Sequence, residues 1–406
     1  MKRLRRLSNN RVVEFCEDII INILHCLPSK SLARFNCVSK DWHKYIADSS
    51  LSYSCRFRRW RPQPNLIGFF YQSWETPKRS QIRFFFSSNE VNNIDGSSLD
   101  ESVNSLGRKR VYIVASSNGF LLCNDLTGVY YVYNPATRQS LALPKTQIDM
   151  TDPFVGFICK VDDPNKDVIS FTIVRYVMPL VWEFLSTITI ETFSSETNVW
   201  TANIKIFEPI GLWLPILDKK SSSTCGAIDG VLFWWLENGR HITAYDSVDK
   251  SFWALELPND EEMVPRRSCY LGISSGALYF ALNLGEAITV WRLESNIRSR
   301  DAVWVRIYKA NVVSTILQCP EAYGLGVNAL SLKEFGIVGS IGIKVQSMVI
   351  HPAIPHIFYL DVRGKVISYD LETDIAEFVH DFGEYWWRTQ HFKLFAYEWH
   401  QWPRLL

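Results

Sequence analysis

The chain opens with a segment whose apolar residues recur at helical spacing. Within residues 14–51, two adjoining rows of apolar positions predict an amphipathic helix that carries Ile19, Ile20, Ile23, Leu24 and Leu27. Pro28 ends this helix, because proline has no backbone N–H and disfavours helix in the residue before it. Ser29 then predicts the N-cap of a second helix, which buries Leu32 and Phe35.

A third helix is predicted after Val38 and Ser39, with one apolar side formed by Trp42, Tyr45 and Ile46. A segment of about forty residues rarely buries enough apolar surface to offset its chain entropy. The module therefore needs a partner, either the rest of the chain or another protein. Periodicity alone leaves open a second interpretation, in which the three helices are the ordinary start of a larger domain.

From Leu66 onward the pattern changes to that of β-structure. Residues 66–72 (LIGFFYQ) and 82–87 (IRFFFS) predict strands, because aromatic and β-branched residues run together over short lengths. Residues 88–109 are rich in Ser, Asn and Gly and predict a loop.

A loose repeat of strand, tight turn and strand follows, and it predicts a β-propeller. Turns are predicted at Asn118-Gly119, Asp229-Gly230 and Ser275-Gly276, where glycine supplies positive φ. Gly230 and Gly276 lie 46 residues apart, which is close to one four-stranded blade. Strands with this period bury both faces by stacking around a ring. We therefore expect an α+β multidomain chain, a three-helix module followed by an all-β propeller of about six to eight blades.

Composition supports this division and adds a charge asymmetry. Aromatic residues make up 14% of the chain and there are 15 Trp, which favours extended β-structure. The net charge is +1, yet residues 1–64 hold 13 Lys and Arg against 5 Asp and Glu, a net charge of +8. The remaining residues hold 30 against 37, a net charge of −7. A basic module on a mildly acidic body suggests an acidic partner for the module.

Nine cysteines with scattered spacing and no CxxC pair predict reduced thiols rather than a disulfide framework. No apolar run of signal-peptide length follows the basic residues 1–6, and no stretch reaches the ~18 apolar residues that a membrane helix needs. We expect a cytoplasmic or nuclear protein without a membrane partner. Residues 1–6 (MKRLRR) suggest a nuclear-import signal, although short basic tails without that role are common.

The helical module at residues 14–51 resembles an F-box. It matches the residue types and spacings of that family at Asp18, Ile19, Ile20, Ile23, Leu24, Leu27, Pro28, Lys30, Ser31, Leu32, Phe35, Val38, Ser39, Lys40 and Trp42. Two positions depart from the family pattern: its opening Leu-Pro is Phe15-Cys16 here, and its later Asp-Pro is Asp48-Ser49. The resemblance implies a docking module for the Skp adaptor of a cullin–RING ubiquitin ligase. It also implies the adaptor-binding residues, which are Phe15, Asp18, Ile19, Ile20, Ile23, Leu24, Leu27, Pro28, Leu32, Val38 and Trp42.

The repeats resemble the F-box-associated, kelch-like domain of plant F-box proteins. The resemblance rests on residues 117–123 (SNGFLLC), 133–137 (YNPAT) with Leu143-Pro144, and 228–234 (IDGVLFW). We predict a basic tail (1–13), an F-box-like module (14–51), a linker (52–64) and a propeller (65–406). Residues 385–406 match no repeat, so the pattern does not show how the ring closes.

Candidate chemistry is sparse. His351 and His356 flank two prolines with Asp361 beyond, and this set suggests either a metal site or an ordinary loop; its spacing matches no standard metal site. No hydrolase, zinc-protease, P-loop or dinucleotide motif is present. We expect no catalytic residue, metal or cofactor. We expect the pairs Trp234-Trp235 and Trp386-Trp387 to pack between blades rather than to bind a ligand.

Residues 52–64 (SYSCRFRRWRPQP) interleave arginines with aromatics, as some nucleic-acid-binding segments do. One short cluster in a near-neutral chain indicates a solvated linker instead, so no nucleic-acid partner is expected. Taken with the resemblance, the sequence predicts a substrate receptor that docks to the Skp adaptor, and through it to cullin and RING subunits. Loops of the propeller hold an unidentified target protein. The rival interpretations are a non-ligase scaffold and a propeller enzyme.

Overall fold

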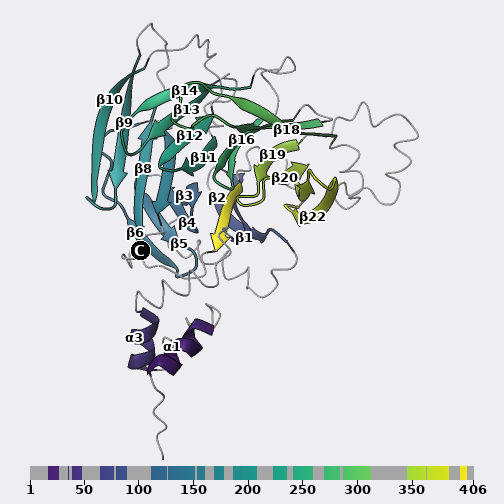
Figure 1. The fold of residues 1–406 in the computed structure, drawn as a ribbon. Helices are drawn as coiled ribbons and strands as arrows, with labels where there is room; N and C mark the ends of the chain where they lie inside the picture. The colour runs from purple at the N-terminus through teal and green to yellow at the C-terminus, as the bar shows by residue number, and fades with distance from the viewer. Residues whose placement is uncertain are drawn as a thin grey trace, which may run out of the picture. The chain divides into compact units, whose positions relative to one another are not determined.

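The computed structural model describes residues 17–26, 35, 39–47, 65–76, 79–88, 111–125, 127–150, 153–160, 169–177, 186–207, 223–235, 241–258, 269–283, 287–311, 345–362, 364–383 and 394–399. The chain divides into two compact units, Met1–Pro62 with Asp162–Asp167 and the remainder of the chain. The described helices belong to the first unit and the described strands to the second (Figure 1).

The helical unit contains two described helices, α1 (Glu17–Cys26) and α3 (Lys40–Ala47). They correspond to the first and third helices that the periodicity predicts. The predicted middle helix lies outside the described residues, apart from Phe35, which is helical. The ring of Phe35 meets that of Trp42 edge-on, with centroids 5.3 Å apart, so these two aromatics contact each other within the unit.

The second unit is a six-bladed β-propeller, in which five blades have four strands and one has three. Blade 1 contains β3 (Val111–Ser117), β4 (Phe120–Asp125), β5 (Tyr130–Asn134) and β6 (Gln139–Ala142). Blade 2 contains β7 (Phe154–Lys160), β8 (Ser170–Tyr176), β9 (Ser186–Ser194) and β10 (Val199–Phe207). Blade 3 contains β11 (Ser223–Ile228), β12 (Val231–Trp235), β13 (His241–Asp246) and β14 (Phe252–Glu256).

Blade 4 contains β15 (Cys269–Ser274), β16 (Ala277–Asn283), β17 (Ala287–Leu293) and β18 (Trp304–Asn311). Blade 5 contains β19 (Val345–Ile350), β20 (Ile357–Val362), β21 (Lys365–Asp370) and β22 (Ile375–Asp381). Blade 6 contains β1 (Asn65–Thr76), β2 (Arg79–Phe86) and β23 (Leu394–Trp399). Neighbouring strands within every blade are antiparallel, and six blades lie within the predicted range.

The ring closes through the two ends of the propeller sequence. The inner strand β23 pairs antiparallel with β1, from Asn65 opposite Trp399 to Tyr71 opposite Leu394. Inner strands of successive blades contact each other in the order β23, β3, β7, β11, β15 and β19. The C-terminal stretch that matches no repeat in the sequence thus supplies the inner strand of blade 6. Blade 6, made from both ends of the propeller sequence, packs against blade 5 through Phe69 and Tyr359, and so closes the ring.

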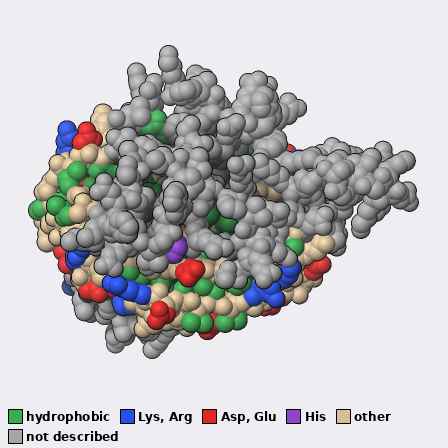
Figure 2. All heavy atoms as spheres, turned by 90° about the horizontal axis from the view of Figure 1, so that it is seen from above, with side chains coloured by type: hydrophobic (Ala, Val, Ile, Leu, Met, Phe, Trp, Pro, Cys, Tyr) green, Lys and Arg blue, Asp and Glu red, His purple; other side chains and the backbone are tan. Residues whose placement is uncertain are grey.

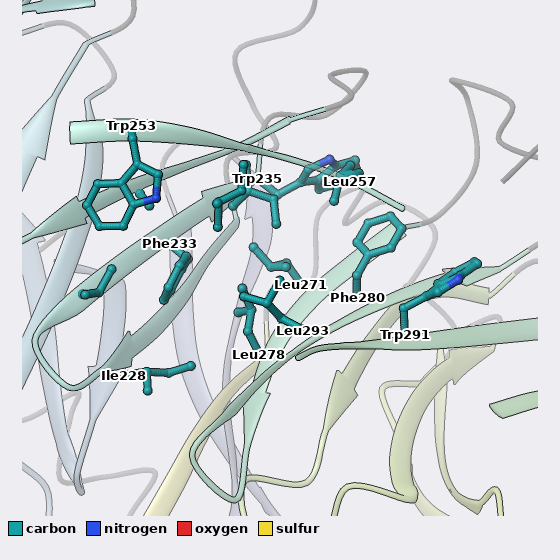
Figure 3. Packing of buried hydrophobic residues seen from close by; sticks show 14 of the residues in the cluster. Ile228, Phe233, Trp235, Trp253, Leu257, Leu271, Leu278, Phe280, Trp291 and Leu293 are labelled. Carbon is teal, nitrogen blue, oxygen red and sulfur yellow. The ribbon is translucent and has the colours of Figure 1, made fainter. Parts of the chain in front are cut away.

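The core consists of layers between neighbouring blades rather than one central cluster. Figure 3 shows the layer between blades 3 and 4, where large side chains from both sheets interdigitate: Phe233, Trp235, Trp253, Phe280 and Trp291. Successive residues of one strand pack in different layers, since Trp234 packs with Tyr176 of blade 2 while Trp235 packs in the layer with blade 4. The predicted blade-to-blade packing of this tryptophan pair is therefore confirmed; Trp386 and Trp387 lie outside the described residues.

The predicted tight turns are present. Asn118, Asp229 and Ser275 adopt φ between 47° and 49°, and each is followed by a glycine with φ between 73° and 84°. Two successive residues with positive φ match the right-handed twist of the strands they join. Glycine is needed at the second position because a side chain is strained at that φ.

A second turn recurs at the outer hairpin of blades 1, 2, 3 and 5. Its fifth residue has φ between 54° and 62° in all four copies, at Arg138, Asn198, Lys250 and Asp374. Its first residue accepts a hydrogen bond from the backbone N–H two positions later, and this residue is Asn134, Ser194, Asp246 or Asp370. Side chains of this kind stabilise the turn locally. The YNPAT string is the first of these copies.

Candidate docking and binding surfaces

Helix α3 begins at a well-formed cap. The Ser39 hydroxyl accepts a hydrogen bond from the backbone N–H of Trp42 at 3.1 Å, and the Ser39 carbonyl accepts one from His43 at 3.0 Å. Asp41 in the first turn and Lys44 in the last complement the helix dipole. The Val-Ser-Lys-x-Trp string therefore has a structural role at Ser39, which fixes where the helix bearing Trp42 begins.

Helix α1 presents an uncovered apolar stripe. Ile19 and Ile23, one turn apart, are 49% and 42% exposed, whereas Leu24 is fully buried and Ile20 is partly buried. The helix thus packs one row of its apolar residues and leaves the other in solvent. Exposed isoleucines at i and i+4 on a short helix form a surface that a protein partner can cover.

The structure places some of the predicted adaptor-binding residues. Ile19, Ile20, Ile23 and Leu24 lie on α1 and Trp42 lies on α3; the backbone of Asp18 is in α1, but its side chain is outside the described part. The remaining predicted positions are outside the described residues, namely Phe15, Leu27, Pro28, Leu32 and Val38. Leu24 is fully buried, so a role for it in docking is indirect.

In the propeller, a buried ion pair joins blade 2 to the connection that leads into it. Arg175 of β8 and Glu191 of β9 lie opposite each other in register, with Nε and Oε2 3.1 Å apart and almost no exposure. Glu191 accepts the backbone N–H of Gln147 at 2.6 Å, and Arg175 donates to the carbonyl of Ile148 at 2.7 Å. Through these two hydrogen bonds the ion pair holds residues 147–148 against blade 2. Sequence patterns do not reveal it, since its partners come from different strands.

A second ion pair joins blades 3 and 4. Arg298 lies in the connection between β17 and β18 and donates to Asp246 of β13 at 2.6 Å. It also donates to the carbonyl of Asp229 at 2.7 Å, so one guanidinium spans both turns at this end of blade 3. Blade 4 lacks the short outer turn of the other four-stranded blades, and its longer connection makes this contact possible.

The suggested metal set of His351, His356 and Asp361 does not come together. Nδ1 of His351 accepts the backbone N–H groups of Ala353 and Ile354, both at 3.1 Å, so it caps a turn. Burial, together with the smaller effect of the neighbouring His356, lowers the pKa of His351 to about 4. His356 instead lies 3.5 Å from Glu372. Among the described residues, no group of three potential ligands could hold a metal ion.

Asp361 has a different character that sequence spacing does not show. It is 1% exposed on β20, directly opposite Ser347 of β19. One carboxyl oxygen accepts the N–H of Gly364 at 2.9 Å, while Oδ2 and the Ser347 hydroxyl have no hydrogen-bond partner among the described residues. Burial raises the pKa of this carboxyl to about 7, against the opposing effect of the Gly364 hydrogen bond. Asp361 lies on the same face of β20 as Tyr359, which packs in the layer between blades 5 and 6.

Charges on the propeller surface are mixed. In the face shown in Figure 2, described Lys and Arg side chains lie close to Asp and Glu side chains along the rim. No described helix has both the length and the hydropathy required to cross a membrane.

Comparison with known proteins agrees with the two-part architecture. An F-box domain model matches residues 13–53, and a model described as "F-box protein At3g26010-like, beta-propeller" matches residues 89–390. F-box protein At5g03970 of Arabidopsis thaliana is 26% identical over 320 residues, covering 75% of this chain and 71% of the relative. F-box proteins At5g49610 and At3g26010, from the same plant, are each 24% identical to this chain, and each alignment covers 76% of it. The alignments cover 78% of At5g49610 and 71% of At3g26010.

Solved structures resemble the chain weakly. A chain in a nidogen/laminin complex has a TM-score of 0.36 at 10% identity, covering 77% of this chain and 92% of that one, too low to support an inference. The propeller model alone spans most of the sequence, and the F-box model covers the helical segment before it. The chain therefore belongs to the plant F-box proteins that carry an At3g26010-like β-propeller.

Proposed function

We propose that this protein is the substrate-recognition subunit of a Skp–cullin–F-box ubiquitin ligase. The helical unit docks to the Skp adaptor, which connects it to the cullin and RING subunits. The propeller holds the target protein. The chain has no catalytic role in this proposal, because it raises the local concentration of target beside the subunits that transfer ubiquitin.

The exposed stripe of Ile19 and Ile23 on α1 is the observation that carries the docking half of the proposal. These two residues coincide with positions of the F-box pattern, and Leu24 of the same helix is already buried. The net charge of +8 on residues 1–64 favours an acidic partner. Docking buries both isoleucines, and this contributes about 1.5–3 kcal/mol for each side chain.

Target binding by the propeller is supported by its architecture. Six blades bring many connections from distant parts of the sequence to the two ends of one ring. The strands form a scaffold held by ion pairs and inter-blade packing, and loops on a rigid scaffold are common sites of recognition. No described feature assembles nucleophile, base and oxyanion donors, so nothing among these residues favours the enzyme alternative.

The test mixes the full chain with purified Skp adaptor, cullin and RING subunits and recovers the complex by pull-down. We expect a stable complex, and loss of it in Leu27→Ala with Pro28→Ala, because a leucine that docking buries contributes at least ~2 kcal/mol by itself. Val248→Ala, an exposed propeller substitution, is the control and leaves the complex intact. A soluble double variant that binds the adaptor as the native chain does would contradict the docking proposal. A native chain that does not bind the adaptor would favour the scaffold alternative.

A further inference from the structure

The connection between β17 and β18 departs from the repeat. In blades 1, 2, 3 and 5, four or five residues separate the third strand from the fourth, whereas in blade 4 ten residues do so, from Glu294 to Val303. A short turn is sufficient to join these strands in the other four blades, so the hairpin of blade 4 does not need the additional residues. Where one repeat has an insertion, the inserted residues lie in a loop, and such loops often form the binding surface.

Residues 294–303, called the blade 4 loop below, are fixed to the propeller at their base and in their middle. At the base, the backbone N–H of Glu294 donates to the carbonyl of Val303 at 2.8 Å. Ile297 and Ala302 pack against the layer between blades 3 and 4, which Figure 3 shows. A loop that is already ordered loses little conformational entropy when a partner binds it.

One carboxylate of blade 3 joins the blade 4 loop to the neighbouring turn. Oδ2 of Asp246 accepts a hydrogen bond from Nε of Arg298 at 2.6 Å, and Oδ1 accepts one from the backbone N–H of Val248 at 2.7 Å. The Val248 side chain is 70% exposed. The blade 4 loop and Val248 therefore belong to one surface that spans two blades.

This surface lies on a basic part of an acidic propeller. Residues 287–311, which comprise β17, the blade 4 loop and β18, hold five Lys and Arg against two Asp and Glu, a net charge of +3. The same part of blade 5, residues 365–381, holds one against five, a net charge of −4. Arg300 in the blade 4 loop is exposed and forms no ion pair with any residue that the structure describes, the adjacent Asp301 included.

We propose that the blade 4 loop and Val248 bind an acidic segment of the target protein, with a carboxylate at Arg300 and an apolar side chain on Val248. The planar guanidinium of Arg300 matches the two oxygens of a carboxylate. Arg298 is already paired with Asp246, so Arg300 is the guanidinium that the target meets. The inference rests on the proposed function only in calling the bound protein a target, because peptides can test the surface by itself.

The alternative is a loop with a structural role alone, in which the contact of Arg298 with Asp246 joins blades 3 and 4. Arg300 separates the two interpretations, since its side chain takes no part in that contact. A structural loop is indifferent to the charge at Arg300, whereas a surface that binds a carboxylate is not.

The test selects peptides from a phage-displayed library of short random peptides on the full chain. We expect an excess of peptides in which an acidic residue lies close to an apolar one. Arg300→Glu should change the selected charge from acidic to basic and weaken binding of a selected acidic peptide about tenfold, because it replaces an attraction with a repulsion. Arg306→Glu is the matched control, since Arg306 is exposed on β18 of the same blade, and it should select the same peptides as the native chain.

Two further measurements locate the bound peptide. Val248→Asp should lose the preference for an apolar residue, whereas Ile375→Asp, at an exposed isoleucine of blade 5, should keep it. Hydrogen exchange of the native chain with a selected peptide should show protection at residues 246–250 and 294–303. Protection confined to other parts of the chain overturns the proposal.

The proposal is also overturned by a native chain that selects no acidic peptide, or by equal selection in the native chain and Arg300→Glu. Adaptor binding is measured separately on the same proteins. Intact adaptor binding without peptide selection contradicts the binding surface alone. Peptide selection at Arg300 without adaptor binding supports the surface and contradicts the ligase role instead.

Discussion

In the helical unit, Ile19 and Ile23 are exposed at 49% and 42%, whereas every residue of β12 in blade 3 is buried. The propeller buries large apolar side chains between neighbouring blades, in layers that continue around the ring, and its exposed apolar residues, such as Val248, lie on turns and outer strands. The helical unit covers Leu24 but leaves an apolar stripe uncovered. The described blades therefore cover one another, whereas the described part of the helical unit leaves exposed the surface that we propose the adaptor covers.

The comparison predicts opposite results from removing the two ends of the chain. Residues 65–406 should unfold in one cooperative β-type transition at the temperature of the full chain, because no described propeller layer needs the helices. Removing residues 394–406 should abolish that transition, since β23 supplies the inner strand of blade 6 and buries Leu394, Phe395 and Tyr397. Circular dichroism during heating measures both.

Removal of residues 400–406 alone is the control, and it should leave the transition in place. An insoluble 65–406 fragment would show that the helices belong to the propeller fold. A chain that unfolds normally without β23 would show that blade 6 closes the ring in some other way.

Breaking the Arg175–Glu191 pair should be the next largest effect. Arg175→Ala leaves the Glu191 carboxylate buried without its counter-charge and should cost about 3–5 kcal/mol of unfolding free energy. The double variant Arg175→Met with Glu191→Leu removes both charges and should recover most of that loss. Urea unfolding of the two variants separates them, and equal losses would show that the pair itself, rather than the orphaned charge, stabilises blade 2.

The sequence predicts the strands of the propeller well because the repeats contain their own turn signals, such as Asn118-Gly119 and Asp229-Gly230. It predicts the ends of the ring poorly. Blade 6 takes β1 and β2 from one end and β23 from the other, so no contiguous stretch shows the repeat. The Arg298–Asp246 contact is equally hidden, because its partners belong to different blades. Pairing across such distances depends on tertiary structure, whereas turns depend on adjacent residues.

The candidate docking residues show the same limit. Helical periodicity places Ile19, Ile23 and Leu24 together on the apolar side of one helix, and the structure divides them into two exposed residues and one buried residue. A hydrophobic pattern cannot make that division, because it depends on what packs against the helix. The structure shows in addition which of these residues are exposed and therefore able to contact a partner.

The stability of the propeller should depend on pH through one buried carboxyl group that lies between two blades. The Asp361 pKa rises from 3.8 to about 7 on folding, so the native state holds this proton more tightly than the unfolded chain. Its contribution to stability is therefore full below pH 4 and is lost as the pH rises through 7, by up to about 4 kcal/mol. Asp361→Asn should remove this loss and be more stable than the native chain at pH 8.

Two histidines act in the opposite direction. Burial lowers the pKa of His351 and of His380 to about 4, so folding favours their neutral forms and stability is lost as the pH falls from 6.5 towards 4. Thermal unfolding of Asp361→Asn and the native chain from pH 4 to pH 8 separates the two effects. A gap between them that does not widen with pH would contradict the assignment to Asp361.

The smallest effect concerns Cys16, which stands where the F-box pattern has proline and lies outside the described residues. Proline there fixes a helical φ, so Cys16→Pro should order the module and tighten adaptor binding a few-fold, in line with ~0.4–1 kcal/mol for compatible proline substitutions. Isothermal titration with purified adaptor measures it. A looser complex would show that other residues compensate for the departure.

A thiol at the start of a helix is favoured as thiolate, which suggests a redox-sensitive dock; the alternative is an inert, buried cysteine beside Phe15. Mild peroxide should weaken adaptor binding by the native chain and not by Cys16→Ser. An equal response of the two proteins would remove support for the redox-sensitive dock.

The central claim is that the exposed stripe on α1 serves a partner and not the fold. Its most direct test is titration of the purified Skp adaptor into the full chain and into Ile19→Asp with Ile23→Asp, with thermal unfolding of both proteins. We predict that adaptor affinity falls at least about 100-fold, from the lost burial of two isoleucines, while the propeller transition stays unchanged. Unchanged affinity in a folded double variant would contradict the account.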